Sequence, residues 1–144
     1  MGFTIPDSLL PADGTGYITS EDSDLTCNAC TWTSRKWSHT SENNMLLVRL
    51  FYKSSSPAYE ELKNLSEQEL VKVALLDIER SLGITSEPVS SQVTKWQDNM
   101  PNYSLKHHQS VEKLEQRLDQ AFPGIFLAGC SYYGVGIPDC IANG

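Results

Sequence analysis

One segment near the middle of the chain has apolar residues at helical spacing. They fall three or four positions apart, so their side chains share one face of a helix. Ser66 and Glu69 have the spacing of a capping box, and Gly83 suits the C-terminal cap. The pattern therefore predicts an amphipathic helix over 66–82. Its apolar positions are Leu70, Val71, Ala74, Leu75, Ile78 and Leu82.

A second apolar stripe predicts another amphipathic helix over 105–121, ended by Pro123 and Gly124. Shorter apolar runs bounded by turn residues predict strands. Because the first three are joined by turns rather than helical crossovers, the sheet is expected to be antiparallel. The fold class predicted is α+β, with a mostly antiparallel sheet and two packed amphipathic helices. The predicted strands are 15–20, 25–33, 45–52, 89–96 and the shorter 125–128.

Length and composition narrow the range of functions. The chain has 144 residues, of which 40% are hydrophobic, and this is the size and composition of one globular domain. Its net charge of −7 argues against a non-specific nucleic-acid binder, which needs a cationic surface. The sequence has no apolar run of the length of a membrane span and no signal-peptide pattern at its start.

The four cysteines do not have the spacing of a metal site. Cys27 and Cys30 form a C-x-x-C within a predicted strand, where residues three apart point to opposite faces. Cys130 and Cys140 are too far apart for the second pair of a four-thiolate zinc site. We therefore predict no metal site and four reduced, partly buried thiols, which fits a reducing compartment.

The last part of the chain combines glycines with a helix start. Pro138 suits the first turn of a helix that begins near residue 137. Such a start directs free N–H groups and the positive end of the helix dipole at whatever lies before it. The same pattern is typical of a tight turn without a ligand, and both interpretations stay open. The full dinucleotide fingerprint G-x-G-x-x-G is absent.

Three blocks of the sequence resemble the oxygen-dependent protoporphyrinogen and coproporphyrinogen oxidases, FAD-dependent enzymes of haem biosynthesis. The third block is highly specific, and the resemblance covers nearly the whole chain. The sequence looks most like the Gram-positive bacterial type, whose substrate is usually coproporphyrinogen III, and the choice between protoporphyrinogen and coproporphyrinogen stays open. The blocks are Gly14-Thr-Gly-Tyr17 with Ala29-Cys-Thr-Trp-Thr-Ser-Arg-Lys-Trp37, then Val93-Thr-Lys-Trp96 with Met100-Pro-Asn-Tyr103, and Ala128-Gly129 with Tyr133-Gly-Val-Gly-Ile-Pro-Asp-Cys-Ile141.

The resemblance implies a set of FAD contacts. The backbone of Val135, Gly136 and Ile137 would lie along the flavin ring, with the helix start facing its N1–C2=O edge. Trp96 and Gly129 belong to the same cofactor-binding set. Negative charge accumulates at that edge on reduction of the flavin, so the implied position agrees with the dipole argument.

The resemblance also implies a porphyrinogen pocket lined by Tyr17, Ile18 and Trp32, since a flat tetrapyrrole needs apolar and aromatic walls. An ordinary core position is the alternative for Trp32. His107 lies where the family has a Gly-His pair, and the sequence has Leu105 and Lys106 before it. We nominate no general base and no other catalytic residue.

The fingerprint that binds the FAD phosphates near the N-terminus of such enzymes is missing here. We therefore expect a C-terminal fragment that is inactive alone, with 1–123 from the substrate-binding domain of a flavin amine-oxidase-like enzyme and 124–144 a truncated FAD-domain segment. In the full enzyme, O2 accepts the electrons. A stand-alone tetrapyrrole-binding module and a structural interaction domain are the alternatives. A cytoplasmic location is expected, while peripheral membrane association and oligomeric state stay open.

Overall fold

Four short strands form an antiparallel sheet in the order β1-β4-β3-β2. Neighbouring strands pair in register, so that Cys30 of β3 lies between Tyr17 of β2 and Leu50 of β4. The α+β class predicted from the sequence is confirmed. The strands are β1 (Gly2–Phe3), β2 (Gly16–Ile18), β3 (Ala29–Trp32) and β4 (Leu46–Phe51).

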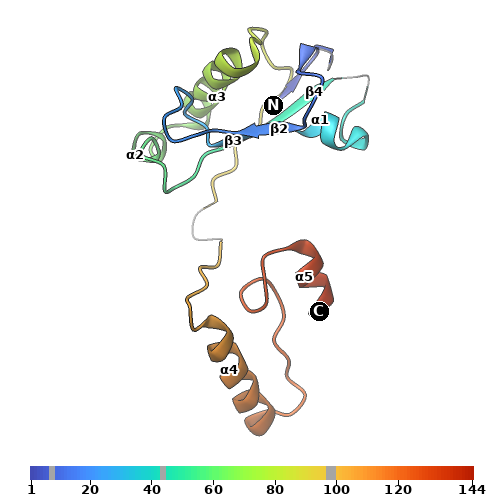
Figure 1. Ribbon diagram of the computed structural model, residues 1–144, viewed down its shortest axis with the longest axis vertical. Helices are drawn as coiled ribbons and strands as arrows, with labels where there is room; N and C mark the ends of the chain where they lie inside the picture. Colours follow the sequence, from blue (N-terminus) through green and yellow to red (C-terminus); the bar gives the residue numbers. More distant parts are fainter. Residues whose placement is uncertain (7–8, 43–44, 97–99) are drawn as a thin grey trace. The chain divides into compact units, whose positions relative to one another are not determined.

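The computed structural model describes residues 1–6, 9–42, 45–96 and 100–144. They form two units, Met1–Thr94 and Lys95–Gly144. The first unit holds the sheet and three helices besides a short 3-10 helix, and the second holds two helices (Figure 1). The helices of the first unit are α1 (Thr33–Lys36), α2 (Tyr59–Leu62) and α3 (Glu67–Leu82), with the 3-10 helix η2 (Ser38–Thr40). Those of the second are α4 (His107–Ala121) and α5 (Ile137–Ala142).

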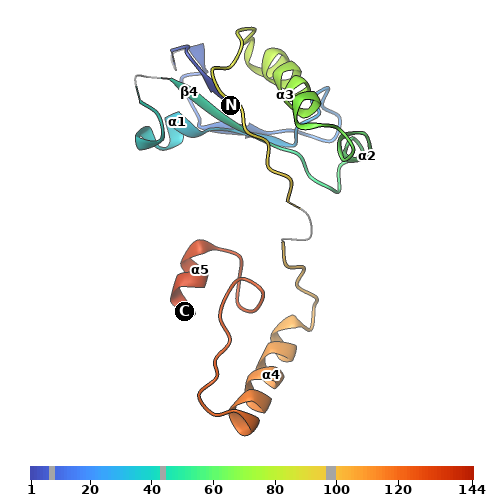
Figure 2. The same ribbon diagram turned by 180° about the vertical axis from the view of Figure 1, so that it is seen from behind.

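Helix α3 lies over one face of the sheet, as the two opposite views show (Figures 1 and 2). Its predicted capping box is present, with Ser66 Oγ accepting from the Glu69 N–H at 3.3 Å. The Glu69 carboxylate accepts from the Ser66 N–H at 2.8 Å in return. Gly83 ends the helix with a left-handed φ of 67°, so the predicted bounds of this helix are confirmed.

The core of the first unit lies between α3 and the sheet. Strand β4 alternates, with Leu46 and Val48 buried and Arg49 and Phe51 exposed. Ile78 of α3 is fully buried in the same core. The side chains of the core cluster are Phe3, Leu10, Cys30, Trp32, Leu46, Val48, Ile78 and Ile84.

Two predicted strands are wrong. In 89–96, Ser90 makes a single bridge to Gly2, because the first residues of the chain form β1 and take the edge beside β4. Gly2 donates to the Ser90 carbonyl at 2.9 Å, and Val89 donates to the Gly2 carbonyl at 2.8 Å. Residues 125–128 are not a strand, since no described segment pairs with them. A strand without a paired neighbour leaves its backbone groups unsatisfied.

Two stretches for which the sequence predicted no element form short structures. The first residues of the chain contain β1, and the polar stretch after β3 contains α1 and η2. Neither stretch has an apolar period that would have revealed it. In the second unit, α4 begins at His107, two residues after the predicted start, and α5 begins at Ile137 as predicted. No helix among the described residues has both the length and the apolar character to cross a bilayer.

Candidate functional site

The glycine turn of the second unit leads directly into α5. Gly136 is the N-cap residue, and its carbonyl accepts from the Cys140 N–H at 2.9 Å. Pro138 lies in the first turn, where its missing N–H leaves no helical bond unmade. Asp139 folds back against the turn: a Cβ added at Gly136 would lie 2.5 Å from its Oδ2 atom. The helix start predicted from sequence is therefore present, with a carboxylate beside it.

The five residues expected to contact FAD all lie in the second unit, and they are accessible. Trp96 is 72% exposed and Ile137 is 76% exposed, while Val135 is also exposed. Gly129 has a φ of 105° and open space where a Cβ would stand, so the backbone there can be approached closely. Exposed apolar side chains, an open glycine backbone and a helix start fit a flat, electron-accepting ring.

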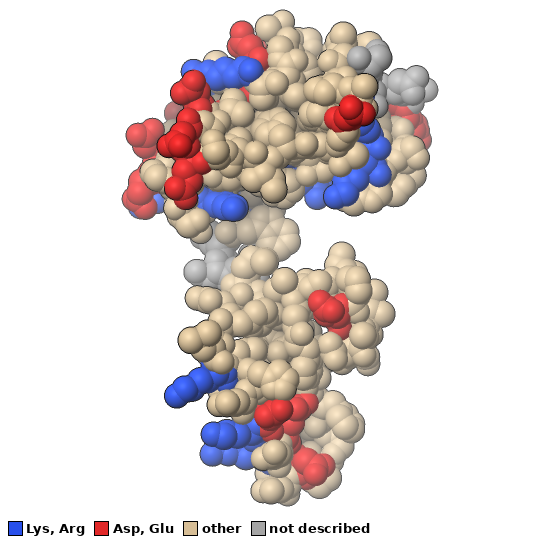
Figure 3. Space-filling view, viewed as in Figure 1, with Lys and Arg blue, Asp and Glu red and all other residues tan. Residues whose placement is uncertain are grey.

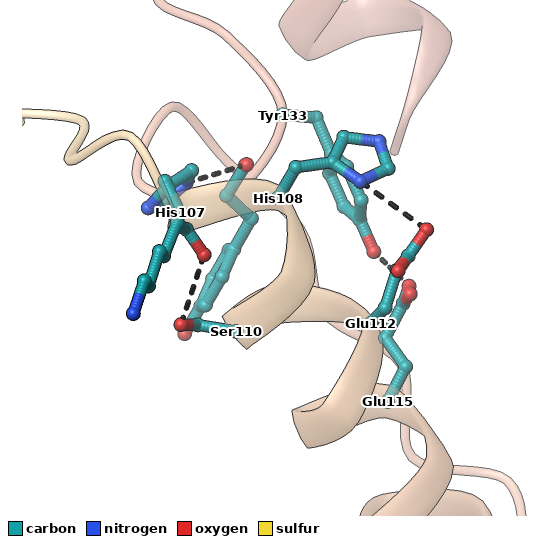
Figure 4. Close-up of polar contacts among 8 residues, drawn as sticks. His107, His108, Ser110, Glu112, Glu115 and Tyr133 are labelled. Atoms are coloured by element: carbon teal, nitrogen blue, oxygen red, sulfur yellow. Dashed lines mark hydrogen bonds and ion pairs between the residues drawn. The ribbon is translucent and has the colours of Figure 1, made fainter.

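Helix α4 holds the loop that precedes the glycine turn (Figure 4). The Tyr133 hydroxyl donates to the Glu115 carboxylate, and this hydrogen bond raises the pKa of Tyr133. The His107 Nε2 atom lies 2.9 Å from the Tyr132 carbonyl oxygen, to which it donates. The Tyr103 hydroxyl donates to the Cys130 carbonyl. Together these contacts fix residues 130–133 against α4 and the segment that precedes it.

Neither histidine of α4 is placed as a general base. The His107 ring is committed to the loop carbonyl and lies against the Tyr103 ring, with centroids 4.6 Å apart. His108 is largely exposed, and its Nδ1 atom lies 3.2 Å from a Glu112 carboxylate oxygen one turn later (Figure 4). These contacts are structural, so the site still has no nominated catalytic residue.

A hollow of about 590 Å³ lies within the second unit, and both Tyr133 and Glu115 line it. None of the residues expected to contact FAD lines it. Sequence reasoning had no signal for this hollow, since it depends on how the tail returns to α4. Its lining residues are Glu115, Leu118, Asp119, Gly124, Ile125, Phe126, Leu127, Tyr133, Ala142, Asn143 and Gly144.

The three residues expected to line the substrate pocket lie in the first unit, but not on one surface. Tyr17 and Ile18 are neighbours on β2, so their side chains point to opposite faces of the sheet. Tyr17 points toward α3, where its hydroxyl donates to Ser81 Oγ at 2.7 Å. Ile18 is 82% exposed on the opposite face. Trp32 is only 4% exposed and packs in the core cluster. It therefore has the ordinary core position that was the alternative to a place in the pocket.

A buried acid that sequence reasoning missed lies behind Tyr17. Asp77 of α3 is fully buried, and its carboxylate accepts from the N–H groups of Thr26 and Cys27, each at 2.8 Å. The Tyr52 hydroxyl also donates to it at 3.0 Å. The sequence did carry a signal for this buried acid. Asp77 follows Ala74 by three residues, so it lies on the apolar face of the predicted helix.

Burial keeps the titratable groups around this acid neutral. It raises the pKa of Cys27 to about 11 and that of Cys30 to about 12. Burial also raises the pKa of Tyr17 and of Tyr52. Because only the thiolate is nucleophilic, these thiols are unreactive near neutral pH. All four cysteines are free, and no group of three or more metal-ligating side chains occurs in the described part of the chain.

Comparison with known proteins gives one consistent result. The model of a family described as "Flavin containing amine oxidoreductase" matches residues 6–144. A coproporphyrinogen III oxidase of Bacillus subtilis is 35% identical over 144 residues, which are 100% of this chain and 30% of that protein. A coproporphyrinogen III oxidase of Staphylococcus aureus is 30% identical over 132 residues, or 92% of this chain and 28% of that protein.

The structural comparison agrees with the sequence comparison. A crystal structure from Exiguobacterium sp. 255-15, provisionally named a protoporphyrinogen oxidase, matches with a TM-score of 0.77 and 32% sequence identity. The match covers 99% of this chain and 31% of that one. The chain therefore spans about 30% of the length of the curated relatives that it matches.

Proposed function

The chain belongs to the flavin-containing amine oxidoreductase family, and on this premise we propose that it forms part of a FAD-dependent porphyrinogen oxidase of haem biosynthesis. The enzyme would convert coproporphyrinogen III or protoporphyrinogen IX to the porphyrin, with O2 as electron acceptor. The observation that carries this proposal is the 35% identity to a coproporphyrinogen III oxidase over all 144 residues. The 144-residue chain alone is expected to be inactive.

The relatives favour coproporphyrinogen III as the substrate. Seven relatives that each match over at least 88% of this chain are all named coproporphyrinogen III oxidase. A protoporphyrinogen oxidase of Schizosaccharomyces pombe matches at 35% identity, but over only 78 residues. The longer alignments are the better guide to the substrate, because the Bacillus subtilis match extends over the whole of this chain.

FAD, when bound, supplies the two-electron acceptor that takes hydride from the porphyrinogen and passes electrons to O2 with formation of peroxide. The chain's own contribution is binding and orientation. The accessible backbone of Val135, Gly136 and Ile137 would lie along the flavin ring, with Trp96 and Gly129 as further contacts. The N-terminus of α5 would favour the electron-rich edge of the ring.

The proposal also assigns the parts of the chain to domains. Residues 1–123 would belong to the substrate-binding domain and 124–144 to the FAD domain. This division differs from the two units of the structure. Along the sequence, the first unit ends at Thr94 and the second begins at Lys95, and the units are defined by packing within each. A cytoplasmic location is part of the proposal, supported by the four free cysteines.

A segment exchange tests the proposed function. The matching C-terminal segment of the Bacillus subtilis relative is replaced by this chain, and porphyrin fluorescence then reports oxidation of coproporphyrinogen III. We expect an exchanged enzyme that retains FAD and turns over. The control is the same relative with the segment deleted, which should be inactive. An exchanged enzyme that is folded and holds FAD but makes no porphyrin would contradict the proposal.

A tetrapyrrole-binding module without catalysis is the second candidate. One observation favours it: the first unit has a buried core of its own, formed by residues within 1–94. Absorbance titration of the purified chain with coproporphyrin III, followed by an oxidase assay of the exchanged enzyme, separates the two. Porphyrin binding together with an inactive exchanged enzyme would favour the module.

A further inference from the structure

The position of the glycine turn before α5 depends on hydrogen bonds more than on packing or charge. In the described part of the second unit, Val111 is the one buried hydrophobic residue, and it belongs to α4. Asp139 is the one residue with a charged side chain within 124–144. Figure 3 shows the charged side chains of this unit gathered mainly over α4. Hydrogen bonds therefore decide where the backbone of 135–137, the expected flavin contact, lies.

One set of contacts joins the turn to the helix that follows it. The Cys140 Sγ atom donates to the Gly134 carbonyl at 3.5 Å, and the Cys140 N–H donates to the Gly136 carbonyl at 2.9 Å. The Asp139 side chain lies against the turn, since a Cβ added at Gly134 would lie 3.1 Å from its Oδ2 atom. The turn and α5 thus form one local segment, and its position relative to α4 needs further contacts.

Two of these further contacts are open to solvent. The Tyr103 hydroxyl donates to the Cys130 carbonyl, and the Tyr133 hydroxyl donates to the Glu115 carboxylate (Figure 4). Both hydrogen bonds are exposed, so water competes for the same groups. Each of them therefore contributes little to the position of the turn.

The third contact is made by His107, the first residue of α4, which is half-buried. Its Nε2 atom donates to the Tyr132 carbonyl at 2.9 Å. Because a carbonyl can only accept, this nitrogen carries the ring proton. The ring also packs against the Tyr103 ring, with centroids 4.6 Å apart. One face and one edge of the imidazole are thus engaged, which fixes its orientation and that of the carbonyl it holds.

We propose that His107 is a positioning residue for FAD, which holds the Tyr132 carbonyl and thereby sets where the backbone of 135–137 meets the flavin ring. The inference rests on the proposed function and deepens it, because it assigns a role to a residue outside the expected cofactor contacts. Backbone polar groups close to a flavin ring tune its electronics. A displaced turn therefore changes the affinity for FAD and the reduction potential of the bound flavin together.

The affinity of the exchanged enzyme for FAD is the first test. His107→Phe keeps a ring against Tyr103 but loses the donor to Tyr132. We expect FAD to bind about fivefold more weakly, as for the loss of one partly buried hydrogen bond. His107→Gln supplies an amide N–H for the same carbonyl and should recover most of the affinity. The matched control is His108→Gln, which removes the neighbouring exposed imidazole and should bind FAD as the unaltered enzyme does.

The midpoint potential of the bound flavin separates positioning from a general loss of stability. Reduction places negative charge on the ring, and backbone N–H groups close to it stabilise that charge. With FAD at saturation, His107→Phe should therefore have a more negative potential than His108→Gln and the unaltered enzyme. His107→Gln should return toward the unaltered value. A variant that had only lost stability would keep the unaltered potential in its folded fraction.

Hydrogen exchange of the 144-residue chain without FAD tests the contact itself. His107→Phe should speed the exchange of amides within 130–136, because the loop is released from α4. Exchange within α3 of the first unit should stay unchanged. His108→Gln should exchange as the unaltered chain does in both regions.

Three results would each overturn the proposal: equal FAD affinities of His107→Phe and His108→Gln, an unchanged potential in His107→Phe, or unchanged exchange within 130–136. The proposed function is judged separately, by turnover of the unaltered exchanged enzyme. Turnover combined with any of these results would reject the role of His107 and leave the oxidase function in place. An unaltered exchanged enzyme that is folded but holds no FAD would reject both.

Discussion

The Asp77 carboxylate accepts a hydrogen bond of 2.8 Å from the backbone N–H of Cys27. This contact joins α3 to the segment that enters β3, fifty positions earlier in the chain. A second oxygen of the same carboxylate binds the neighbouring Thr26 N–H at 2.8 Å. The helix and the sheet are thus connected by a buried acid as well as by apolar packing, and this sets the position of β3 beneath α3.

Replacing this acid should strongly destabilise the first unit. Asp77→Ala leaves the buried Cys27 N–H, the partly buried Thr26 N–H and the Tyr52 hydroxyl without their acceptor. We expect a loss of about 3–4 kcal/mol in the free energy of unfolding, since each unsatisfied buried group costs about 1–3 kcal/mol. Urea unfolding followed by tryptophan fluorescence measures it.

Two companion variants sharpen this test. Asp77→Asn keeps one acceptor oxygen but turns an NH2 group toward a donor, so its loss should be about 2 kcal/mol. Glu79→Gln changes an exposed acid on the same helix and should shift the free energy of unfolding by less than about 0.5 kcal/mol. An Asp77→Ala chain as stable as Glu79→Gln would show that the acid contributes nothing.

The local signals of the sequence were sufficient for the long elements. Helix α3 and strand β4 follow from apolar spacing and from the Ser66 cap, because these signals lie within the element itself. Strand β1 could not be predicted, since Gly2 and Phe3 become a strand only by pairing with β4, about 45 residues later. The strand predicted over 89–96 was wrong for a related reason, because the edge of the sheet beside β4 is already occupied by β1.

The candidate site was predictable in part. The glycine turn and the start of α5 follow from Gly136 and Pro138, which act locally. The substrate residues were chosen by resemblance alone, and alternation along β2 already implied that Tyr17 and Ile18 could not share a wall.

Gly16 cannot be replaced without displacing β3. Its φ is 154°, and a Cβ there would lie 2.3 Å from the Cys30 carbonyl oxygen, which is backbone and cannot move aside alone. We expect Gly16→Ala to destabilise the chain by about 2–3 kcal/mol. Gly83→Ala is the matched control, because its φ of 67° also favours glycine but no atom lies within 4 Å. That control should cost only about 1 kcal/mol, and equal losses would contradict the steric argument.

The four thiols should differ in their reaction with a disulfide reagent such as DTNB. Cys130 is exposed and Cys140 is partly buried, whereas Cys27 and Cys30 are buried. In the native chain we expect a fast phase from Cys130, a slower one from Cys140, and reaction of the remaining two only on unfolding. Cys130→Ser should remove the fast phase. Rapid reaction of all four thiols in the folded chain would show that the core is open.

The same buried thiols predict how stability depends on pH. In the folded chain the pKa of Cys27 is raised from 9.0 to about 11, and that of Cys30 from 9.0 to about 12. The unfolded chain loses these protons first, so the free energy of unfolding should fall as pH rises from 9 to 11. Stability from these two groups is complete below pH 9. A Cys27→Ala, Cys30→Ala chain should show a smaller decrease, and an unchanged decrease would assign it to the tyrosines.

The first unit should fold without the second. Every residue of the core cluster lies between Phe3 and Ile84, and the sheet and α3 lie within the same range. Among the described residues beyond 94, Val111 is the buried hydrophobic one, so the second unit has little core of its own. A chain ending at Thr94 should therefore keep one cooperative urea transition, with a free energy of unfolding within about 1 kcal/mol of that of the full chain. Asp77→Ala introduced into the shortened chain should cost as much as in the full chain, because its partners are all retained. If the shortened chain shows no cooperative transition, residues 95–144 are needed to complete the core of the first unit.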